Sequence, residues 1–305
     1  PSRERVFLPH VFQAVLLAQR SHLGIRPRRG GLQLARRLPR RSGADFLAER
    51  LGDIKRRVPV AVELGCRNGC LAAELSGLNG IERLIQCDLS PVMVASASGS
   101  YRVVADEEWL PFANESLDLV ISALSLHWVN DLPGALIQIR RALRPDGLFL
   151  GAIFGGDSLT ELRQSLARAE SEVEGGISPR VAPFVEIRDL GALLQRAGFA
   201  LPVVDSDTIN VSYPDALALM RELRGMGESN VLRERRTGFS RRSTLLTAAE
   251  HYRDMFGDEN GRIPATFEVL YLAGWCPHES QQQPLKPGSG KVSLTKALGE
   301  PEVPD

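Results

Sequence analysis

The sequence predicts a doubly wound α/β fold, in which helices cover both faces of a mostly parallel sheet. Short apolar segments alternate with helical patterns between residues 45 and 154. The first apolar segment ends in glycines, and the next two end in acidic residues. Alternation of strand and helix implies right-handed crossovers and parallel strands. Ligands of such sheets bind outside the carboxyl ends of the strands, so we expect the functional site at that edge.

The composition fits one globular unit and excludes several classes of protein. With 305 residues, 43% of them hydrophobic, the chain can bury a sizeable core. The 37 basic and 37 acidic residues cancel, so no nucleic-acid partner is expected. Four cysteines without a Cys-x-x-Cys pair predict neither a disulfide framework nor a structural zinc site. No apolar run reaches the length of about eighteen residues that a membrane span needs, while peripheral attachment stays open.

The first 43 residues differ from the rest, with ten arginines, no lysine and a single acid, Glu4. An arginine-rich, acid-poor and amphipathic segment is typical of a mitochondrial presequence. A basic tail or a nucleic-acid arm is the alternative. We expect the folded domain at residues 44–280, with its core at 58–155 and an elaboration at 156–280. Residues 281–305 are rich in Gln, Pro, Gly and Lys, which predicts a disordered tail.

The first strand and the turn after it predict a ligand site. Val60–Leu64 is apolar except for Glu63, as expected of a strand buried on both faces. Gly65 and Gly69 follow, and they allow the backbone to turn tightly and to approach a ligand. A helix over residues 70–76 would then present free N–H groups to that ligand. The pattern therefore favours a nucleotide-type site.

Acidic residues end the next two strands. Residues 84–89 predict a strand that ends in Asp88, about twenty residues beyond the glycine turn, where an acid can accept hydrogen bonds from ribose hydroxyls. The alternative is that Asp88 caps the following helix or lies in a turn. Residues 101–104 predict a third strand, and Asp106 and Glu107 follow it.

The remaining elements follow from periodicity and from helix and turn signals. Pro145 and Gly147 predict a turn, and Ser158 with Glu161 forms a capping-box sequence before a helix that Gly175 and Gly176 close. Further helices are predicted at 45–57, 92–97, 132–143, 185–196, 215–224 and 243–256, and further strands at 117–122, 148–154, 201–211 (one or two strands) and 266–275.

With the strands assigned, residues 46–154 resemble the class I S-adenosylmethionine-dependent methyltransferases. The resemblance implies a Rossmann-like, seven-stranded sheet, here with helical additions at the carboxyl end, and S-adenosyl-L-methionine as cofactor. Arg67 stands where a glycine could be, a departure that narrows the approach of the cofactor. The residues that match the family's cofactor site are Glu63, Gly65 and Gly69 near the methionine part, Asp88 at the ribose, and Leu89, Asp106 and Glu107 around the adenine.

A closer resemblance is to a family of mitochondrial complex I assembly factors of methyltransferase fold, over residues 46–280. It rests on the segments at 122–131, 155–163 and 225–230. It implies an enzyme of the mitochondrial matrix, peripheral to the inner membrane, that hydroxylates an arginine of an iron–sulfur subunit of complex I. The arginine-rich start agrees with that compartment independently. The five histidines offer no His-x-Asp pair, so no iron site is predicted from the residues.

Two other functions stay open. Residues 124–131 also resemble the malonyl-carrier-protein O-methyltransferase of biotin synthesis, although the segments around Asp157 and Gly225 do not. A non-catalytic assembly chaperone that retains the fold is the third hypothesis, and Arg67 favours it.

Three features are candidates for substrate contacts. His127 and Trp128 follow the fourth strand and could line the substrate entrance, or they could simply pack in the core. Residues 225–230 are expected to form either a mobile loop over the pocket or a surface turn. Asp157 and Glu161 could bind an arginine as paired carboxylates, but we expect Asp157 to cap its helix.

Overall fold

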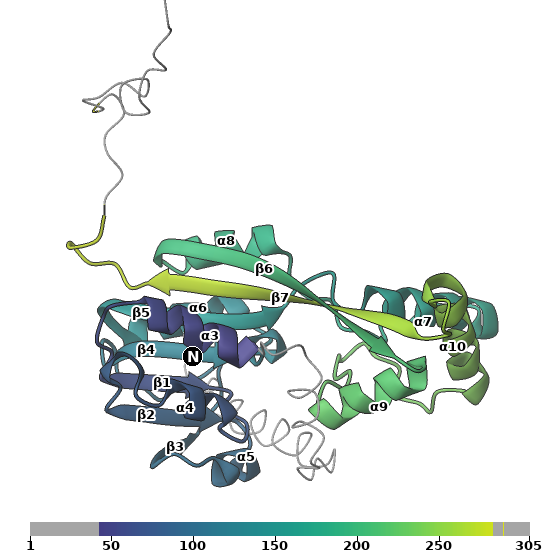
Figure 1. Ribbon diagram of the computed structural model, residues 1–305, viewed down its shortest axis with the longest axis horizontal. Coiled ribbons are helices and arrows are strands. Elements are labelled where there is room, and N and C mark those ends of the chain that lie inside the picture. Colours follow the sequence, from purple (N-terminus) through teal and green to yellow (C-terminus); the bar gives the residue numbers. More distant parts are fainter. Residues whose placement is uncertain (1–42, 283–288, 290–305) are drawn as a thin grey trace, which may run out of the picture.

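The computed structural model describes residues 43–282 and residue 289 (Figure 1). The predicted presequence lies outside these residues except for its last position, as does the predicted tail except for residues 281, 282 and 289.

The described residues contain a sheet of seven strands in the order β3-β2-β1-β4-β5-β7-β6. The first five strands of this order run parallel, and β7 pairs antiparallel with β5 and with β6. The prediction of a doubly wound, mostly parallel, seven-stranded sheet is therefore confirmed. The strands are β1 (Val60–Leu64), β2 (Arg83–Asp88), β3 (Tyr101–Val104), β4 (Leu117–Ala123), β5 (Leu143–Phe154), β6 (Ala200–Tyr213) and β7 (Ile263–Trp275).

Helices bury apolar residues on both faces of the sheet. Leu47, Leu75 and Leu166 belong to one core cluster, whereas Leu136 and Leu194 belong to the cluster on the other face. The helices that supply the first cluster are α3 (Gly43–Asp53), α4 (Cys70–Leu75), α7 (Thr160–Glu174), α9 (Ala216–Met226) and α10 (Arg242–Phe256); those that supply the second are α6 (Leu132–Ala142) and α8 (Ile187–Arg196). The short elements are α5 (Pro91–Ser96) and the 3-10 turns η1 (Leu78–Gly80) and η2 (Leu126–Trp128).

The strands β6 and β7 continue past the rest of the sheet as a two-stranded ribbon. The pairing of β5 with β7 ends at Phe154 and Val269, whereas β6 and β7 stay paired as far as Tyr213 and Ile263. Because β7 runs antiparallel to β5, this ribbon extends beyond the carboxyl edge of the parallel strands. Figure 1 shows α7, α9 and α10 gathered around its far end. The helices α7, α9 and α10 form a helical lobe, and the ribbon holds this lobe beside the carboxyl edge of the sheet, where the ligand site is expected.

The turn predicted at residues 144–147 is instead a bulged part of β5. Leu143 pairs with Leu117, but the next paired residue is Leu148, so the intervening residues bulge out. These residues still form backbone hydrogen bonds to the chain just after β7, because the N–H of Asp146 donates to the carbonyl of Cys276 at 3.0 Å. Proline and glycine signalled the irregularity correctly, while the pairing partners keep the chain in the sheet.

The capping box predicted at Ser158 and Glu161 is wrong. The residue at the N-cap of α7 is Leu159, at φ 56°, with no side-chain capping bond. The Ser158 hydroxyl donates to the carbonyl of Glu268 at 3.0 Å, and the Glu161 carboxylate accepts the N–H of Thr266 at 3.2 Å. Both side chains therefore fasten α7 to the ribbon instead of closing the helix on itself.

Candidate functional site

The glycine turn after β1 packs directly against the segment after β4. Gly65 has φ 66° and Gly69 has φ 77°, both in the left-handed region that favours glycine. A Cβ atom on Gly65 would lie 2.2 Å from the side chain of Ser125, and one on Gly69 would lie 2.6 Å from Nε2 of Gln86. The glycines are required here because the chain passes so close to its neighbours.

Glu63 lies behind this turn, inside the sheet. Its side chain accepts a 3.0 Å hydrogen bond from Gln86, which faces it on β2. Burial raises the pKa of Glu63 to about 7, the bond from Gln86 opposes this rise, and the charge of Asp88 adds to it. The structure therefore places a carboxyl group that titrates near neutral pH at the end of β1.

Asp88 ends β2 and ties the glycine turn in place. Its Oδ2 accepts the N–H of Arg67 at 2.9 Å, and its Oδ1 accepts the N–H of Ser90 at 2.8 Å. The alternative that Asp88 caps the next helix is wrong, because Ser90 is the N-cap of α5 and accepts the N–H of Met93, whereas the bond from the N–H of Ser90 agrees with the other alternative, a turn at Asp88. A carboxylate can accept about four hydrogen bonds, so acceptor positions remain on this side chain.

The two acids after β3 lie differently. Glu107 is buried, and its Oε1 is 3.3 Å from the position of a Cβ on Gly65, so it lies against the glycine turn. Asp106 is half-buried, and its Oδ1 accepts the N–H of Glu108 at 2.9 Å within its own turn. Leu89, which follows Asp88, is buried.

Arg67, which stands where the family pattern would have a glycine, connects segments along the carboxyl edge of the sheet. Its φ is 50°, a left-handed conformation that costs a non-glycine residue about 1 kcal/mol or more. Its Nη2 donates to the carbonyl of Leu124 at 2.8 Å and to Oε1 of Glu228 at 3.0 Å. The guanidinium thus joins the glycine turn, the end of β4 and the segment after α9.

His127 packs in the core and also contacts the Arg67–Glu228 pair, which agrees with the packing interpretation, while its role at a substrate entrance stays a prediction. Its side chain is 4% exposed, and its ring lies 5.0 Å from that of Phe154 and 5.3 Å from that of Trp128. Its Nε2 is 3.2 Å from Oε2 of Glu228, while its Nδ1 is buried without a hydrogen-bond partner among the described residues. Trp128 is half-buried beside it.

Glu228 links the helical lobe to the glycine turn. It follows the end of α9, and its side chain is only 12% exposed, so the alternative of a bland surface turn at residues 225–230 is wrong for this residue. Burial alone would raise the pKa of Glu228. The hydrogen bond and charge of His127, together with Arg67, more than offset burial and hold the pKa below its usual range. The carboxylate is therefore ionised and paired.

The paired carboxylates suggested at Asp157 and Glu161 do not form. Glu161 binds Thr266 on β7, and the N–H of Asp157 donates to the Glu268 carboxylate at 3.1 Å. The capping role expected of Asp157 is also wrong, since the N-cap of α7 is Leu159.

Sequence analysis missed the partners that connect distant segments. Glu228 is 101 residues from His127 and 161 from Arg67, and no spacing rule relates such positions. The contact of Ser125 with Gly65 and the bond of Gln86 to Glu63 were missed for the same reason. Only the alternation of strands and helices, which brings strand ends to one edge, could have pointed to them.

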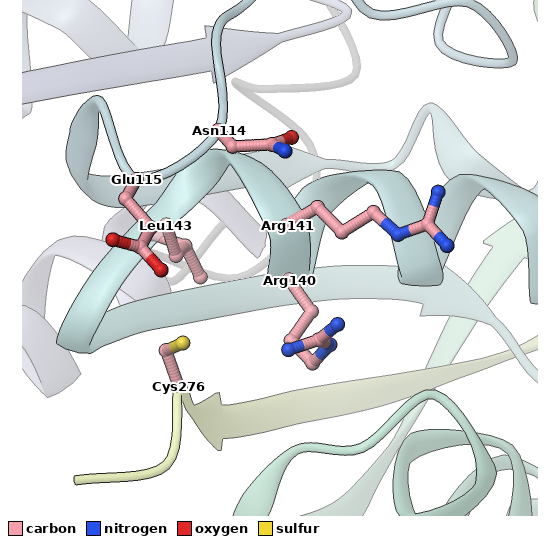
Figure 2. Close-up of a pocket in the computed structure, with 6 residues that line it drawn as sticks. All are labelled: Asn114, Glu115, Arg140, Arg141, Leu143 and Cys276. Carbon is pink, nitrogen blue, oxygen red and sulfur yellow. The ribbon is translucent and has the colours of Figure 1, made fainter.

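A cavity of about 250 Å³ lies at the opposite end of the sheet, where β5 begins and β7 ends. Figure 2 shows Arg140 pointing from α6 toward this cavity, while Arg141 extends away from Cys276. No side chain of the predicted cofactor site lines it. The residues that line it are Asn114, Glu115, Arg140, Arg141, Leu143 and Cys276.

The described residues contain neither a metal-binding cluster nor a membrane-spanning helix. No group of three or more His, Cys, Asp or Glu residues in this part of the chain could hold a metal ion. No helix in residues 43–282 is long and apolar enough to cross a membrane.

Comparisons with known proteins agree with the fold. A family model described as a methyltransferase domain matches residues 62–151. The crystal structure of the YcgJ protein from Bacillus subtilis superposes with a TM-score of 0.54 at 15% identity, covering 77% of this chain and 98% of that one. At this identity the likeness shows the fold alone.

Similar sequences place the chain more narrowly. It is 47% identical over 252 residues to "Arginine-hydroxylase NDUFAF5, mitochondrial" of Danio rerio, covering 81% of this chain and 78% of that protein. It is 48% identical to the protein of the same name from Homo sapiens, covering 81% and 72%. It is 31% identical to a malonyl-[acyl-carrier protein] O-methyltransferase of Methylovorus sp., covering 82% and 86%. The chain is therefore an enzyme with a methyltransferase-like fold, and it belongs to the family of the mitochondrial arginine hydroxylases NDUFAF5.

Proposed function

We propose that this enzyme binds S-adenosyl-L-methionine and, with an external two-electron oxidant that supplies the oxygen atom, hydroxylates an arginine of an iron–sulfur subunit of respiratory complex I during its assembly. The observation that carries the proposal is the 47% identity, over four-fifths of the chain, to proteins named arginine hydroxylases. These relatives are also named as mitochondrial proteins, in agreement with the arginine-rich first 43 residues of this chain. The proposal places the enzyme in the matrix, peripheral to the inner membrane, as the resemblance of its segments implies.

The residues at the carboxyl edge fit the nucleoside part of such a cofactor. Asp88 keeps acceptor positions for ribose hydroxyls after binding two backbone N–H groups. Gly65 lets the turn pass directly against Ser125, and the buried side chain of Leu89, next to Asp88, would pack on the adenine as the resemblance implies. In this proposal Asp106 and Glu107 lie beside the adenine, and Glu63 supports the glycine turn from inside the sheet. When bound, the cofactor carries a methyl group on a positively charged sulfur.

Calorimetric titration of the full chain with S-adenosyl-L-methionine tests the cofactor. Binding that Asp88→Asn weakens about tenfold or more is expected, since a carboxylate is the stronger acceptor. The matched control is Asp53→Asn, at the exposed end of α3. Equal affinity in the wild type and Asp88→Asn, with both proteins folded by circular dichroism, would contradict this part of the proposal.

Mass spectrometry of complex I tests the reaction. Iron–sulfur subunits from mitochondria that lack the enzyme are compared with subunits from the same cells supplied with it again. The expected result is an arginine-containing peptide that gains the mass of one oxygen only when the enzyme is present. A gain of one methyl group would instead show methylation, and identical peptides in both samples would argue against any modification of these subunits.

A second candidate function follows from the 31% identity to the malonyl-carrier-protein O-methyltransferase. It is tested with malonyl carrier protein and S-adenosyl-L-methionine, and ester formation would support it. A third candidate is an assembly role of this enzyme that does not need its catalysis, and the observation that favours it is Arg67, which joins the glycine turn to Leu124 and Glu228. If complex I assembles normally with Asp88→Ala, assembly does not depend on cofactor binding.

A further inference from the structure

The Arg67 guanidinium lies in a set of oxygen acceptors that the rest of the fold supplies. One acceptor is the carbonyl of Leu124, 2.8 Å from Nη2, and the other is Oε1 of Glu228, 3.0 Å away. These acceptors come from the end of β4 and from the segment after α9. The N–H of Leu124 donates to the carbonyl of Ala152 at 2.8 Å, and that of Glu228 to the carbonyl of Leu223 at 2.9 Å, so contacts other than those of Arg67 also hold both residues.

The surroundings of the Glu228 carboxylate favour a cation as its partner. Its carboxylate is nearly enclosed, and His127 fixes its second oxygen at 3.2 Å. An ionised carboxylate that is buried without a partner costs several kcal/mol, so a positively charged group must face it. A guanidinium meets this demand with planar, directed N–H donors and remains charged at any physiological pH.

Leu124 aims its carbonyl at the same point by adopting an unusual backbone conformation. Its φ is 51°, in the left-handed region that residues with a side chain rarely occupy. Such conformations persist where the surrounding structure determines them, and they cluster at ligand sites. Arg67 itself is at φ 50°, so two non-glycine residues in this conformation meet at one guanidinium.

The Arg67 side chain is exposed enough to move away from these two acceptors. It is 41% exposed, in contrast to the 12% of Glu228. Another guanidinium could take the same acceptors, because the exchange leaves both the charge and the number of hydrogen bonds at Glu228 unchanged.

We propose that Glu228 and the Leu124 carbonyl form the receptor for the guanidinium of the substrate arginine, and that Arg67 fills this receptor until substrate displaces it. The inference rests on the proposed function for the identity of the substrate. It assigns Glu228 as a residue that selects arginine over lysine, and Arg67 as an internal competitor. Substrate binding then frees the Arg67 side chain from the edge of the glycine turn.

The test measures binding of a small probe, N-acetyl-L-arginine methylamide, to the full chain by calorimetry, without cofactor or protein substrate. Arg67→Gly, which suits the left-handed backbone, is expected to bind the probe at least about tenfold more tightly than the wild type, the effect of about one charge-assisted hydrogen bond. The double variant Arg67→Gly/Glu228→Gln should lose this gain. The affinity for N-acetyl-L-lysine methylamide should rise less in Arg67→Gly than the affinity for the arginine probe.

Equal binding in the wild type and Arg67→Gly, or a gain that persists in the double variant, would overturn the proposal. Since removal of Glu228 can unfold the lobe, Arg67→Gly/Glu228→Asp is the second variant. It keeps the charge but withdraws the carboxylate from Leu124, and it should also lose most of the gain. Thermal unfolding of each variant checks its fold. The probe requires neither cofactor nor oxidant, so its result is independent of the mass spectrometry that tests hydroxylation.

Discussion

Replacing Glu63 by glutamine should make the protein more stable at neutral and alkaline pH, and should leave it almost unchanged in acid. In the folded state the pKa of Glu63 is about 7, raised chiefly by burial, against an ordinary value of 4.5. Below pH 4.5 the carboxyl group is protonated in both states. Between these values the unfolded chain releases the proton and the folded chain keeps it, so the free energy of unfolding falls as pH rises.

The size of the effect follows from the two pKa values. The interval of about 2.5 pH units, at about 1.36 kcal/mol each, amounts to roughly 3 kcal/mol, all of which is lost above pH 7. Glutamine cannot ionise, and its amide oxygen can still accept the hydrogen bond from Gln86. Glu63→Gln should therefore be more stable than the wild type by roughly 3 kcal/mol at pH 8, and by close to nothing at pH 4.5.

Urea unfolding, followed by circular dichroism at several pH values from 4.5 to 8, measures this difference. Groups that do not interact with Glu63 titrate equally in both proteins, so their contribution cancels in the difference between the two curves. Glu74→Gln on α4, where the glutamate is exposed, is the matched control and should follow the wild type at every pH. A constant difference between Glu63→Gln and the wild type over this range would refute the argument.

Three further predictions concern single positions. Gly65→Ala should destabilise the fold by about 2 kcal/mol or more in urea unfolding, because its Cβ would lie 2.2 Å from Ser125. Gly52→Ala in α3, with open space around the Cβ, should instead stabilise it by about 1 kcal/mol; loss of stability here would contradict the helix assignment. Thiol labelling followed by mass spectrometry should modify exposed Cys70 at least about a hundredfold faster than Cys87, whose pKa burial raises to about 12.

Much of the fold could be predicted because local patterns decided it. The β1 strand and its glycine turn follow from a short apolar run that ends in two glycines. The prediction failed where residues with a local sequence signal bind partners that are distant in the sequence. Ser158 and Glu161 have the sequence of a capping box, yet the neighbouring ribbon offers them better-placed partners on β7. At residues 144–147, Pro and Gly gave a correct sign of irregularity but could not reveal pairing with Cys276.

The candidate site was predictable in outline only. The ends of β1, β2 and β3 could be brought to one edge by topology, which grouped Gly65, Asp88 and Glu107 correctly. The sequence also identified Arg67 as a departure, but not the two acceptors that hold it. Glu228 reaches it only because the long ribbon carries α9 beside the sheet, and this geometry depends on strand lengths that periodicity defines poorly.

The position of β7 also has a consequence for how the protein is made. This strand lies between β5 and β6, but it is the last strand in the chain, at Ile263–Trp275. During synthesis from the amino end, the edge of β5 therefore stays unpaired until almost the whole domain has been made. An open, apolar edge invites pairing with other chains. A premature stop before residue 263 should thus yield an aggregating chain rather than a partly active enzyme, and a helper that shields β5 during this interval would raise the yield of folded protein.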